Sequence, residues 1–279
     1  MALEPRMTGF AARLNWLWRL LMTAFCFTLF GVGGLLLSVV WFNLLNLAER
    51  NARRRRRLAR RSIAASFRFF LRVAKAVGVL DYRIDGVQTL RDERGCLVVA
   101  NHPTLIDYVL IASVMPETDC LVKADLLRNP FVSGVIRAAD YLINSQADRL
   151  LPESEKRLRA DDTLLIFPEG TRTRADEPMR LQRGAANIAV RCQADLRVVS
   201  ISCSEHLLDK QSKWYHVPAR KPVFVVTAGE RIHTADFCEV HEGIEPALAA
   251  RQLNRHLLSQ LSQQTTPLAG IHNDASALS

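Results

Sequence analysis

The chain has 279 residues and a formal net charge of +9, but the charge is unevenly distributed. Residues 1–80 carry 14 Arg and Lys residues against Glu4 and Glu49, whereas residues 81–279 are slightly acidic. A basic excess confined to one end excludes a generally basic fold and indicates that this end meets an anionic surface, either a lipid leaflet or nucleic acid. The length suffices for one sizeable α/β domain with an appendage.

Residues 20–48 form an uncharged run of 29 residues, longer than the roughly 20 that a helix needs to cross a bilayer. We therefore expect residues 1–50 to be a membrane anchor rather than a cleaved signal peptide, whose apolar region is about 7 to 15 residues long. Gly31, Gly33 and Gly34 interrupt the run and leave two topologies open. The preferred one is a single span, and the other is a re-entrant hairpin.

Residues 51–80 are predicted to form a basic amphipathic helix. Apolar side chains between Ile63 and Val77 recur at helical spacing, whereas Arg61 and Arg72 lie with other basic residues on a different face. Because the helix directly follows the anchor, we expect it to lie at the lipid interface; the alternative is a helix that packs on the core with a solvated polar face.

From residue 81 the pattern changes to short apolar runs that alternate with helical stretches, which predicts an α/β fold with a mixed sheet flanked by helices. The expected strands are residues 82–85, 96–100, 120–123, 141–143, 163–167, 196–203 and 223–228. The expected helices are residues 104–114, 129–138, 147–159, 181–193 and 246–263. The catalytic domain would thus span residues 81–264, after the membrane-inserted helix or helical hairpin, with residues 265–279 as a disordered tail.

Six cysteines are scattered along the chain without a Cys-x-x-Cys pair. This spacing argues against a zinc site or a disulfide framework and suits a reducing compartment. We expect ordinary buried thiols and no metal ion. The cysteines are Cys26, Cys96, Cys120, Cys192, Cys203 and Cys238.

His102 lies where the expected strand 96–100 gives way to a helix that starts near Thr104. Thr104 could cap this helix, so that Asp107 lies in its first turn and faces back toward the loop. A carboxylate there can orient the imidazole and stabilise its charged form, as a general base requires. The spacing alone also fits a histidine and an aspartate with structural roles at a helix N-terminus.

A second apolar strand, residues 163–167, also leads into a polar loop. Loops at strand ends are where α/β sheets bind ligands. The backbone at Gly170 permits close approach, and Arg172 can grip a phosphate with two hydrogen bonds, so we predict a phosphate site. A surface turn with a solvated arginine is the alternative. The loop contains Glu169, Gly170, Thr171 and Arg172.

Together the segments NHPTLID and FPEGTR resemble the two hallmark motifs of the glycerolipid acyltransferase family, the first being its HX4D motif. This family includes the 1-acylglycerol-3-phosphate acyltransferases, and the resemblance covers roughly residues 60–230. It implies that His102 acts as the general base on the acceptor hydroxyl and that Asp107 supports it. It also implies that the acceptor site is shaped by Glu169, Gly170, Thr171 and Arg172.

The resemblance implies a membrane enzyme of phospholipid biosynthesis whose partners are membrane lipids and an acyl donor, either acyl-CoA or acyl carrier protein. No cofactor, metal or nucleic acid is expected. The catalytic domain would face the cytoplasm, at the inner membrane in a bacterium. Asn144 and Ser145 stand after the strand near Tyr141, where the family usually has an arginine. An acceptor other than lysophosphatidic acid therefore stays open.

Two other functions also stay open. The first is hydrolysis of acyl thioesters, although the sequence has no Gly-x-Ser-x-Gly elbow. The second is a non-catalytic membrane tether in which residues 53–57, five arginines, bind anionic lipid or nucleic acid. An acidic domain after this basic end disfavours a nucleic-acid-binding tether.

Overall fold

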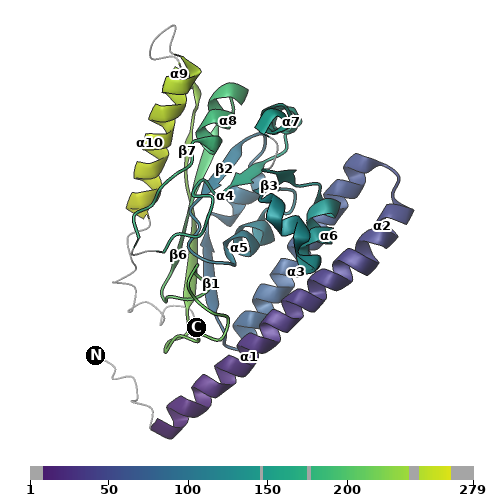
Figure 1. The fold of residues 1–279 in the computed structure, drawn as a ribbon, viewed down its shortest axis with the longest axis vertical. Coiled ribbons are helices and arrows are strands. Elements are labelled where there is room, and N and C mark those ends of the chain that lie inside the picture. Colours follow the sequence, from purple (N-terminus) through teal and green to yellow (C-terminus); the bar gives the residue numbers. More distant parts are fainter. Residues whose placement is uncertain (1–8, 145–146, 175–176, 239–244, 265–279) are drawn as a thin grey trace.

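The computed structural model describes residues 9–144, 147–174, 177–238 and 245–264. Within these ranges a seven-stranded sheet carries helices on both faces, and a long helical hairpin runs along one side of the domain (Figure 1). This is the predicted α/β fold, a mixed sheet flanked by helices and preceded by an apolar helix. The predicted tail, residues 265–279, lies outside the described residues.

The strand order of the described sheet is β1-β7-β6-β2-β5-β3-β4. All neighbouring strands are parallel except β6 and β7, which are antiparallel. Because β2 and β5 are parallel neighbours, the loops that leave their carboxyl ends meet at one edge of the sheet. The strands are Asp81–Asp85 (β1), Leu97–Ala100 (β2), Asp119–Val122 (β3), Leu142–Ile143 (β4), Leu164–Ile166 (β5), Leu196–Cys203 (β6) and Val223–Ile232 (β7).

The helices agree with the predicted ones to within a few residues at each end, and the short segments α4, η2 and α9 are additions that the sequence pattern did not predict. The α-helices are Gly9–Leu36 (α1), Phe42–Ala48 (α2), Ala52–Ala76 (α3), Val87–Asp92 (α4), Asp107–Val114 (α5), Pro130–Ala139 (α6), Ala147–Arg159 (α7), Gly184–Cys192 (α8), Ala235–Cys238 (α9) and Pro246–Gln264 (α10). A π-helical segment, Leu37–Trp41 (η1), and a 3-10 segment, Ala124–Arg128 (η2), complete the described set.

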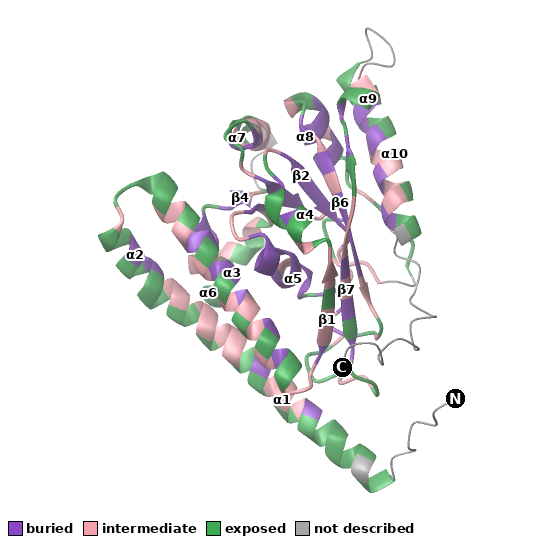
Figure 2. Cartoon of the chain, turned by 180° about the vertical axis from the view of Figure 1, so that it is seen from behind, coloured by how far each residue is buried: buried purple, intermediate pink, exposed green. Residues whose placement is uncertain are grey.

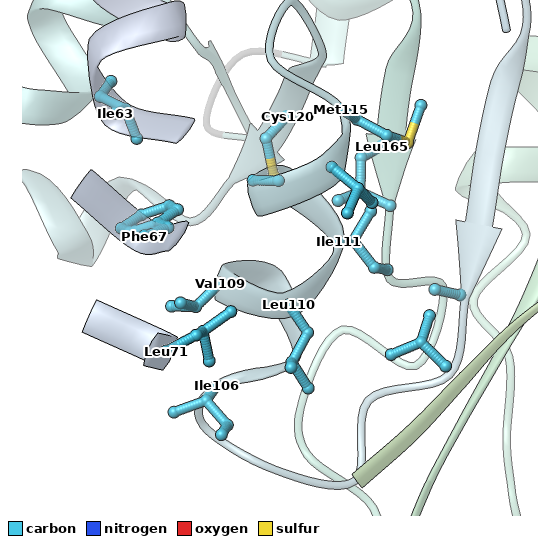
Figure 3. Packing of buried hydrophobic residues seen from close by; sticks show 14 of the residues in the cluster. Ile63, Phe67, Leu71, Ile106, Val109, Leu110, Ile111, Met115, Cys120 and Leu165 are labelled. Atoms are coloured by element: carbon cyan, nitrogen blue, oxygen red, sulfur yellow. The ribbon is translucent and has the colours of Figure 1, made fainter. Parts of the chain in front are cut away.

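Two apolar clusters fill the space on the two faces of the sheet. On β2, Val98 and Ala100 belong to the cluster that α3 and α5 cover, whereas Leu97 and Val99 belong to the cluster under α8 and α10. Figure 3 shows side chains of α3 packed against those of α5 within the first cluster. Because both faces are covered, the central strands are continuously apolar, as buried parallel strands are.

The N-terminal apolar run forms one continuous helix through α1, η1 and α2, and its glycines do not produce a turn. The chain turns instead at residues 49–51, and α3 returns along α1 (Figure 1). Gly34 serves close packing, since a Cβ atom there would lie 2.7 Å from the carbonyl oxygen of Phe131 in α6. By length and composition, Ala12–Ala48 is long and apolar enough to cross a membrane.

The predicted amphipathic helix is α3, and its apolar face packs on the domain rather than facing outward. Ile63, Phe67 and Leu71 are buried against α5 (Figure 3). Basic side chains occupy much of the remaining surface of the helix, where Figure 2 shows exposed residues. The apolar face of α3 therefore packs on the core, as in the alternative prediction. Contact of its basic face with lipid stays a prediction.

Candidate active site

His102 and Asp107 are in direct contact at the carboxyl end of β2. The Nδ1 atom of His102 lies 2.8 Å from Oδ2 of Asp107. The Asp107 side chain is fully buried, whereas that of His102 is 22% exposed and so can be reached from outside. The ring of Phe167, which follows β5, stacks on the imidazole with 4.4 Å between centroids. The predicted pair is thus assembled and held on two sides.

Thr104 differs from its predicted role as a helix cap. Helix α5 begins at Asp107, and its N-cap position, Ile106, makes no side-chain capping bond. The amide of Thr104 donates instead to Oδ2 of Asp107 at 2.7 Å, and its hydroxyl donates to Oδ1. The carboxylate therefore turns back into the loop, because the donors that satisfy it lie there and on His102.

These contacts bear on which ring nitrogen of His102 can accept a proton. Burial raises the pKa of Asp107, while hydrogen bonds and charge from His102 and hydrogen bonds from Thr104 act in the opposite direction. If Nδ1–H of His102 donates to Asp107, Nε2 carries the free lone pair and can accept a proton. Asp107 then stabilises the imidazolium that forms, as in other His-Asp pairs.

Glu169 connects the second loop to the first. Its Oε1 atom accepts from the backbone amide of His102 at 2.6 Å, and the amide of Thr173 donates to the carbonyl oxygen of His102 at 3.0 Å. Glu169 is buried, and burial raises its pKa, against the opposing effect of hydrogen bonds from Thr173 and His102. Its geometry is that of a positioning residue, which fixes the backbone of His102.

Gly170 and Thr171 form the exposed tip of this loop. Gly170 has a φ of 67°, a left-handed conformation that favours glycine, and its amide donates to the carbonyl oxygen of Phe167 at 3.1 Å. Thr171 is exposed beside it. These two predicted acceptor-site residues are therefore accessible, unlike Glu169, in the loop that Glu169 and Thr173 join to His102.

Arg172 is directed toward the segment that follows β6. Its Nη1 atom donates to the carbonyl oxygens of Leu208 and Asp209, each at 2.9 Å. One guanidinium nitrogen is thus engaged by the protein itself, so a phosphate would meet an arginine whose orientation is already fixed. Phosphate binding by Arg172 stays a prediction.

Sequence reasoning assigned no role to several residues that build the site. Asn101 is buried and ties β2 to β6, with its amide group donating to and its carbonyl accepting from the backbone of Ile201 at 2.8 and 2.7 Å. Phe167 and Leu208 were also without a role. Asn101 and Phe167 stand inside the two recognised motifs, which is the signal that could have identified them, whereas Leu208 had none.

No cluster of three or more His, Cys, Asp or Glu side chains suitable for a metal ion occurs in the described part of the chain. The six cysteines are free thiols there. Burial raises the pKa of Cys203 to about 12 and that of Cys192 to about 11, so both stay protonated near neutral pH.

Comparisons with known proteins identify an acyltransferase domain in the part of the chain that contains these loops. A family model described as Acyltransferase matches residues 81–204, which contain both loops. The chain is 24% identical over 154 residues to human 1-acyl-sn-glycerol-3-phosphate acyltransferase beta, covering 53% of this chain and 55% of that protein. It is 28% identical over 166 residues to the 1-acyl-sn-glycerol-3-phosphate acyltransferase of Helicobacter pylori, covering 57% of this chain and 64% of that protein.

Among solved structures, the 1-acyl-sn-glycerophosphate (LPA) acyltransferase PlsC from Thermotoga maritima shares the fold, with a TM-score of 0.63 and 20% identity. That similarity covers 91% of this chain and 95% of the PlsC chain. The matches to the two curated relatives named above span less than two thirds of the length of each relative. The sheet and its paired loops are those of an acyltransferase domain. Over residues 81–204 the chain carries an Acyltransferase domain, and it is similar to curated 1-acyl-sn-glycerol-3-phosphate acyltransferases.

Proposed function

We propose that this chain transfers a fatty acyl group from acyl-CoA or acyl carrier protein to a hydroxyl of a lysophospholipid. The observation that carries the proposal is the joining of the two loops: His102 contacts Asp107 through its ring and Glu169 through its backbone amide. A partly exposed imidazole held by a buried carboxylate, with Gly170 and Thr171 exposed in the adjoining loop, suits general-base catalysis on a bound hydroxyl.

The reaction needs one proton acceptor and no acylated side chain. Nε2 of His102 takes the proton of the acceptor hydroxyl while the oxygen attacks the thioester carbonyl carbon. The carbon–sulfur bond then breaks, and the proton passes from the imidazolium to the leaving thiolate. Asp107 stabilises the imidazolium, and general-base catalysis of this kind contributes about 10² to 10⁴ in rate.

The names of the curated relatives support lysophosphatidic acid as the first acceptor to test. Another acceptor stays open, because the stretch between β4 and α7 begins with Asn144 and contains no arginine that could add a phosphate contact. The acyl donor is equally open between acyl-CoA and acyl carrier protein. The relatives' names specify the acceptor class and not the donor.

We also propose that the N-terminal hairpin lies along the membrane surface instead of crossing it. Trp18 donates to the carbonyl oxygen of Val77 at 3.1 Å, and Trp41 donates to Ser62 at 2.9 Å, so α3 accompanies the apolar helix over much of its length. A perpendicular span would draw the arginines of α3 into hydrocarbon, which is costly. Lying in the interface, the helix presents its exposed apolar side chains to lipid. Figure 2 colours many residues of this helix as exposed.

An apolar cavity of about 510 Å³ lies between the N-terminal helix, α3 and α6. Its lining includes Phe30, Gly33 and Phe67. Phe67 also makes an edge contact with Tyr108, the residue after Asp107, at 5.7 Å between centroids. We propose that this cavity receives a lipid tail, since its lining is almost wholly apolar and it opens beside the hairpin that meets the bilayer.

The experiment is an assay of the purified protein in phospholipid vesicles with lysophosphatidic acid and a labelled acyl donor, in parallel with other lysophospholipids. Mass spectrometry should find the doubly acylated phospholipid formed at the expense of the donor, with palmitoyl-CoA and palmitoyl acyl carrier protein compared directly. Rapid release of free fatty acid without acceptor would instead support a hydrolase. Lipid binding without turnover on any acceptor would support a non-catalytic tether.

A further inference from the structure

The connection between β6 and β7, residues 204–222, carries an exposed group of basic and aromatic side chains. Trp214 and Tyr215 are 50% and 42% exposed. Lys210 and Lys213 are exposed as well, and the ammonium group of Lys213 lies over the ring of Tyr215, 5.6 Å from its centroid. We call residues 204–222 the β6–β7 loop. Its side chains combine the two kinds that concentrate at membrane surfaces, aromatic rings and cations.

Asp209, an acidic residue of this loop, does not offset the charge of these lysines at the surface. Asp209 is buried, and its Oδ1 atom accepts from the amides of Gln211 and Ser212 and from the Ser212 hydroxyl, at 2.7 to 2.8 Å. Its negative charge is therefore directed into the loop. Glu205, at the start of the loop, is partly buried. The outward charge around Trp214 is thus carried by lysine.

The loop is attached to the apolar helix α1. Arg19, a buried arginine of α1, donates through Nη1 to the carbonyl oxygen of Pro218 and through Nη2 to that of Arg220, each at 2.9 Å. Phe27 of α1 meets Trp214 edge-on, with 6.4 Å between ring centroids. Because Phe27 is itself 37% exposed, the aromatic group of the loop continues the exposed apolar surface of α1.

The same loop is attached to the active site. The carbonyl oxygen of Leu208 accepts from the amide of Leu105 at 3.0 Å and from Nη1 of Arg172 at 2.9 Å. Leu105 stands between His102 and Asp107 in the chain. Leu208, whose carbonyl oxygen accepts from Leu105 and Arg172, stands six positions before the exposed Trp214 in the chain.

We propose that the β6–β7 loop is a second membrane-contacting element, in which Lys210 and Lys213 bind anionic phospholipid headgroups while Trp214 and Tyr215 enter the interface beside α1. The proposal rests on the proposed surface position of α1. An anionic bilayer fits better than a protein partner, because the loop borders an exposed apolar helix that already requires lipid. Membrane contact at Trp214 would then order the carbonyls that orient Arg172.

The test uses the fluorescence of Trp214 in the full chain reconstituted into vesicles. The Trp214 signal is the difference between the protein that retains Trp214 and the same protein with Trp214→Phe, since the other three tryptophans lie in α1 and η1. With phosphatidylglycerol in the vesicles, lipids brominated near the headgroup should quench this signal, and aqueous iodide should quench it several-fold less than in phosphatidylcholine alone.

The double variant Lys210→Gln/Lys213→Gln should weaken the dependence on anionic lipid by about fivefold for each lysine. Lys156→Gln, on exposed α7 away from this surface, is the matched control and should change nothing. All proteins carry His102→Ala, so the outcome does not depend on acyl transfer. If iodide still reaches Trp214 while brominated lipid quenches the α1 tryptophans, the loop proposal is overturned and the position of α1 stands.

If brominated lipid quenches neither Trp214 nor the tryptophans of α1, the surface position of the hairpin fails, and the loop proposal fails with it. Protection of Trp214 from iodide by an acidic acyl carrier protein in detergent, with no quenching by brominated lipid, would also overturn the proposal and make the loop a donor-docking surface. The acyltransferase proposal is judged separately, from product formation by the unaltered enzyme.

Discussion

The Nη1 atom of Arg172 lies 2.9 Å from the carbonyl oxygen of Leu208, a residue 36 positions further along the chain. This contact joins the loop after β5 to the β6–β7 loop and fixes the direction of the guanidinium group. Arg172, which is predicted to bind phosphate, therefore also connects two loops. Experiments on Arg172 should distinguish these two roles.

Replacing Arg172 by lysine keeps the charge but removes the planar group that can bond two carbonyls and an anion together. We expect kcat/KM for the acceptor to fall about 10- to 100-fold, as expected for a lost charge-assisted hydrogen bond. Arg191→Lys on α8, remote from the two loops, is the control and should retain full activity. An unchanged kcat/KM in Arg172→Lys would remove Arg172 from the acceptor site.

Acidification should loosen the β6–β7 loop. Burial would raise the pKa of Asp209, but hydrogen bonds from Ser212 and the amide of Gln211 outweigh it, and the pKa is lowered. A carboxyl group with a lowered folded pKa stabilises the fold above its unfolded pKa of about 3.9 and loses that contribution as pH falls through the folded value. Proteolysis after Lys210 or Lys213 should therefore accelerate below about pH 4.

Asp209→Asn offers the corresponding test at neutral pH, since it removes the charge and keeps the size. Cleavage of the loop should already be faster in this variant at pH 7, with little further change on acidification. Equal cleavage of both proteins across the pH range would show that the carboxylate does not order the loop.

A buried group of charges holds α3 to the sheet. Asp119 of β3 is fully buried and contacts Nη2 of Arg60 at 2.8 Å, together with Nη1 of Arg157 from α7. Asp119→Ala would leave two buried guanidinium groups without their shared carboxylate, and we expect a loss of about 3–5 kcal/mol in the free energy of unfolding. Chemical denaturation in detergent measures it.

The matched control is Glu117→Ala, because Glu117 pairs with exposed Arg61 at the surface. Exposed pairs contribute about 0–1 kcal/mol, so its unfolding curve should nearly coincide with that of the unaltered protein. Similar losses in both variants would mean that burial of the Asp119 group has no special importance.

The crossing of η1 and α6 depends on Gly134. A Cβ atom at Gly134 would lie 2.4 Å from Cβ of Ser38, too close for any relaxed contact. Gly134→Ala should therefore destabilise the packing by about 1–3 kcal/mol, although alanine is the better helix former. Gly33→Ala, whose Cβ would meet nothing within 4 Å, should leave the melting temperature equal or higher. The reverse order would contradict the tight crossing.

The elements of the domain were predictable because each carries a local pattern. The continuous apolar run of β2, which is buried on both faces, is typical of a central parallel strand. The helical spacing of apolar residues from Ile63 onward is typical of a helix with one covered face. Each pattern involves only a few neighbouring residues. The short helix α4 was missed because six residues give too little periodicity. The start of α5 was misplaced because the donors of Thr104 satisfy Asp107 from outside the helix, and composition does not reveal such a contact.

The pairing of the two loops could be expected from sequence, since both follow apolar strands and both match motifs of one family. The roles within the loops could not. Glu169 is a buried acceptor for the amide of His102, and Arg172 is bound by carbonyls of residues 208 and 209, which no motif marks. Both facts depend on how β5 and β6 flank β2, a long-range arrangement.

The most direct measurement is the rate of acyl transfer by His102→Ala, compared with the unaltered enzyme in the same vesicles. If the imidazole held by Asp107 is the general base, the rate should fall by about 10²- to 10⁴-fold or more, with unchanged membrane fractionation and melting temperature. A folded His102→Ala protein that transfers acyl groups at a rate close to that of the unaltered enzyme would contradict the assignment.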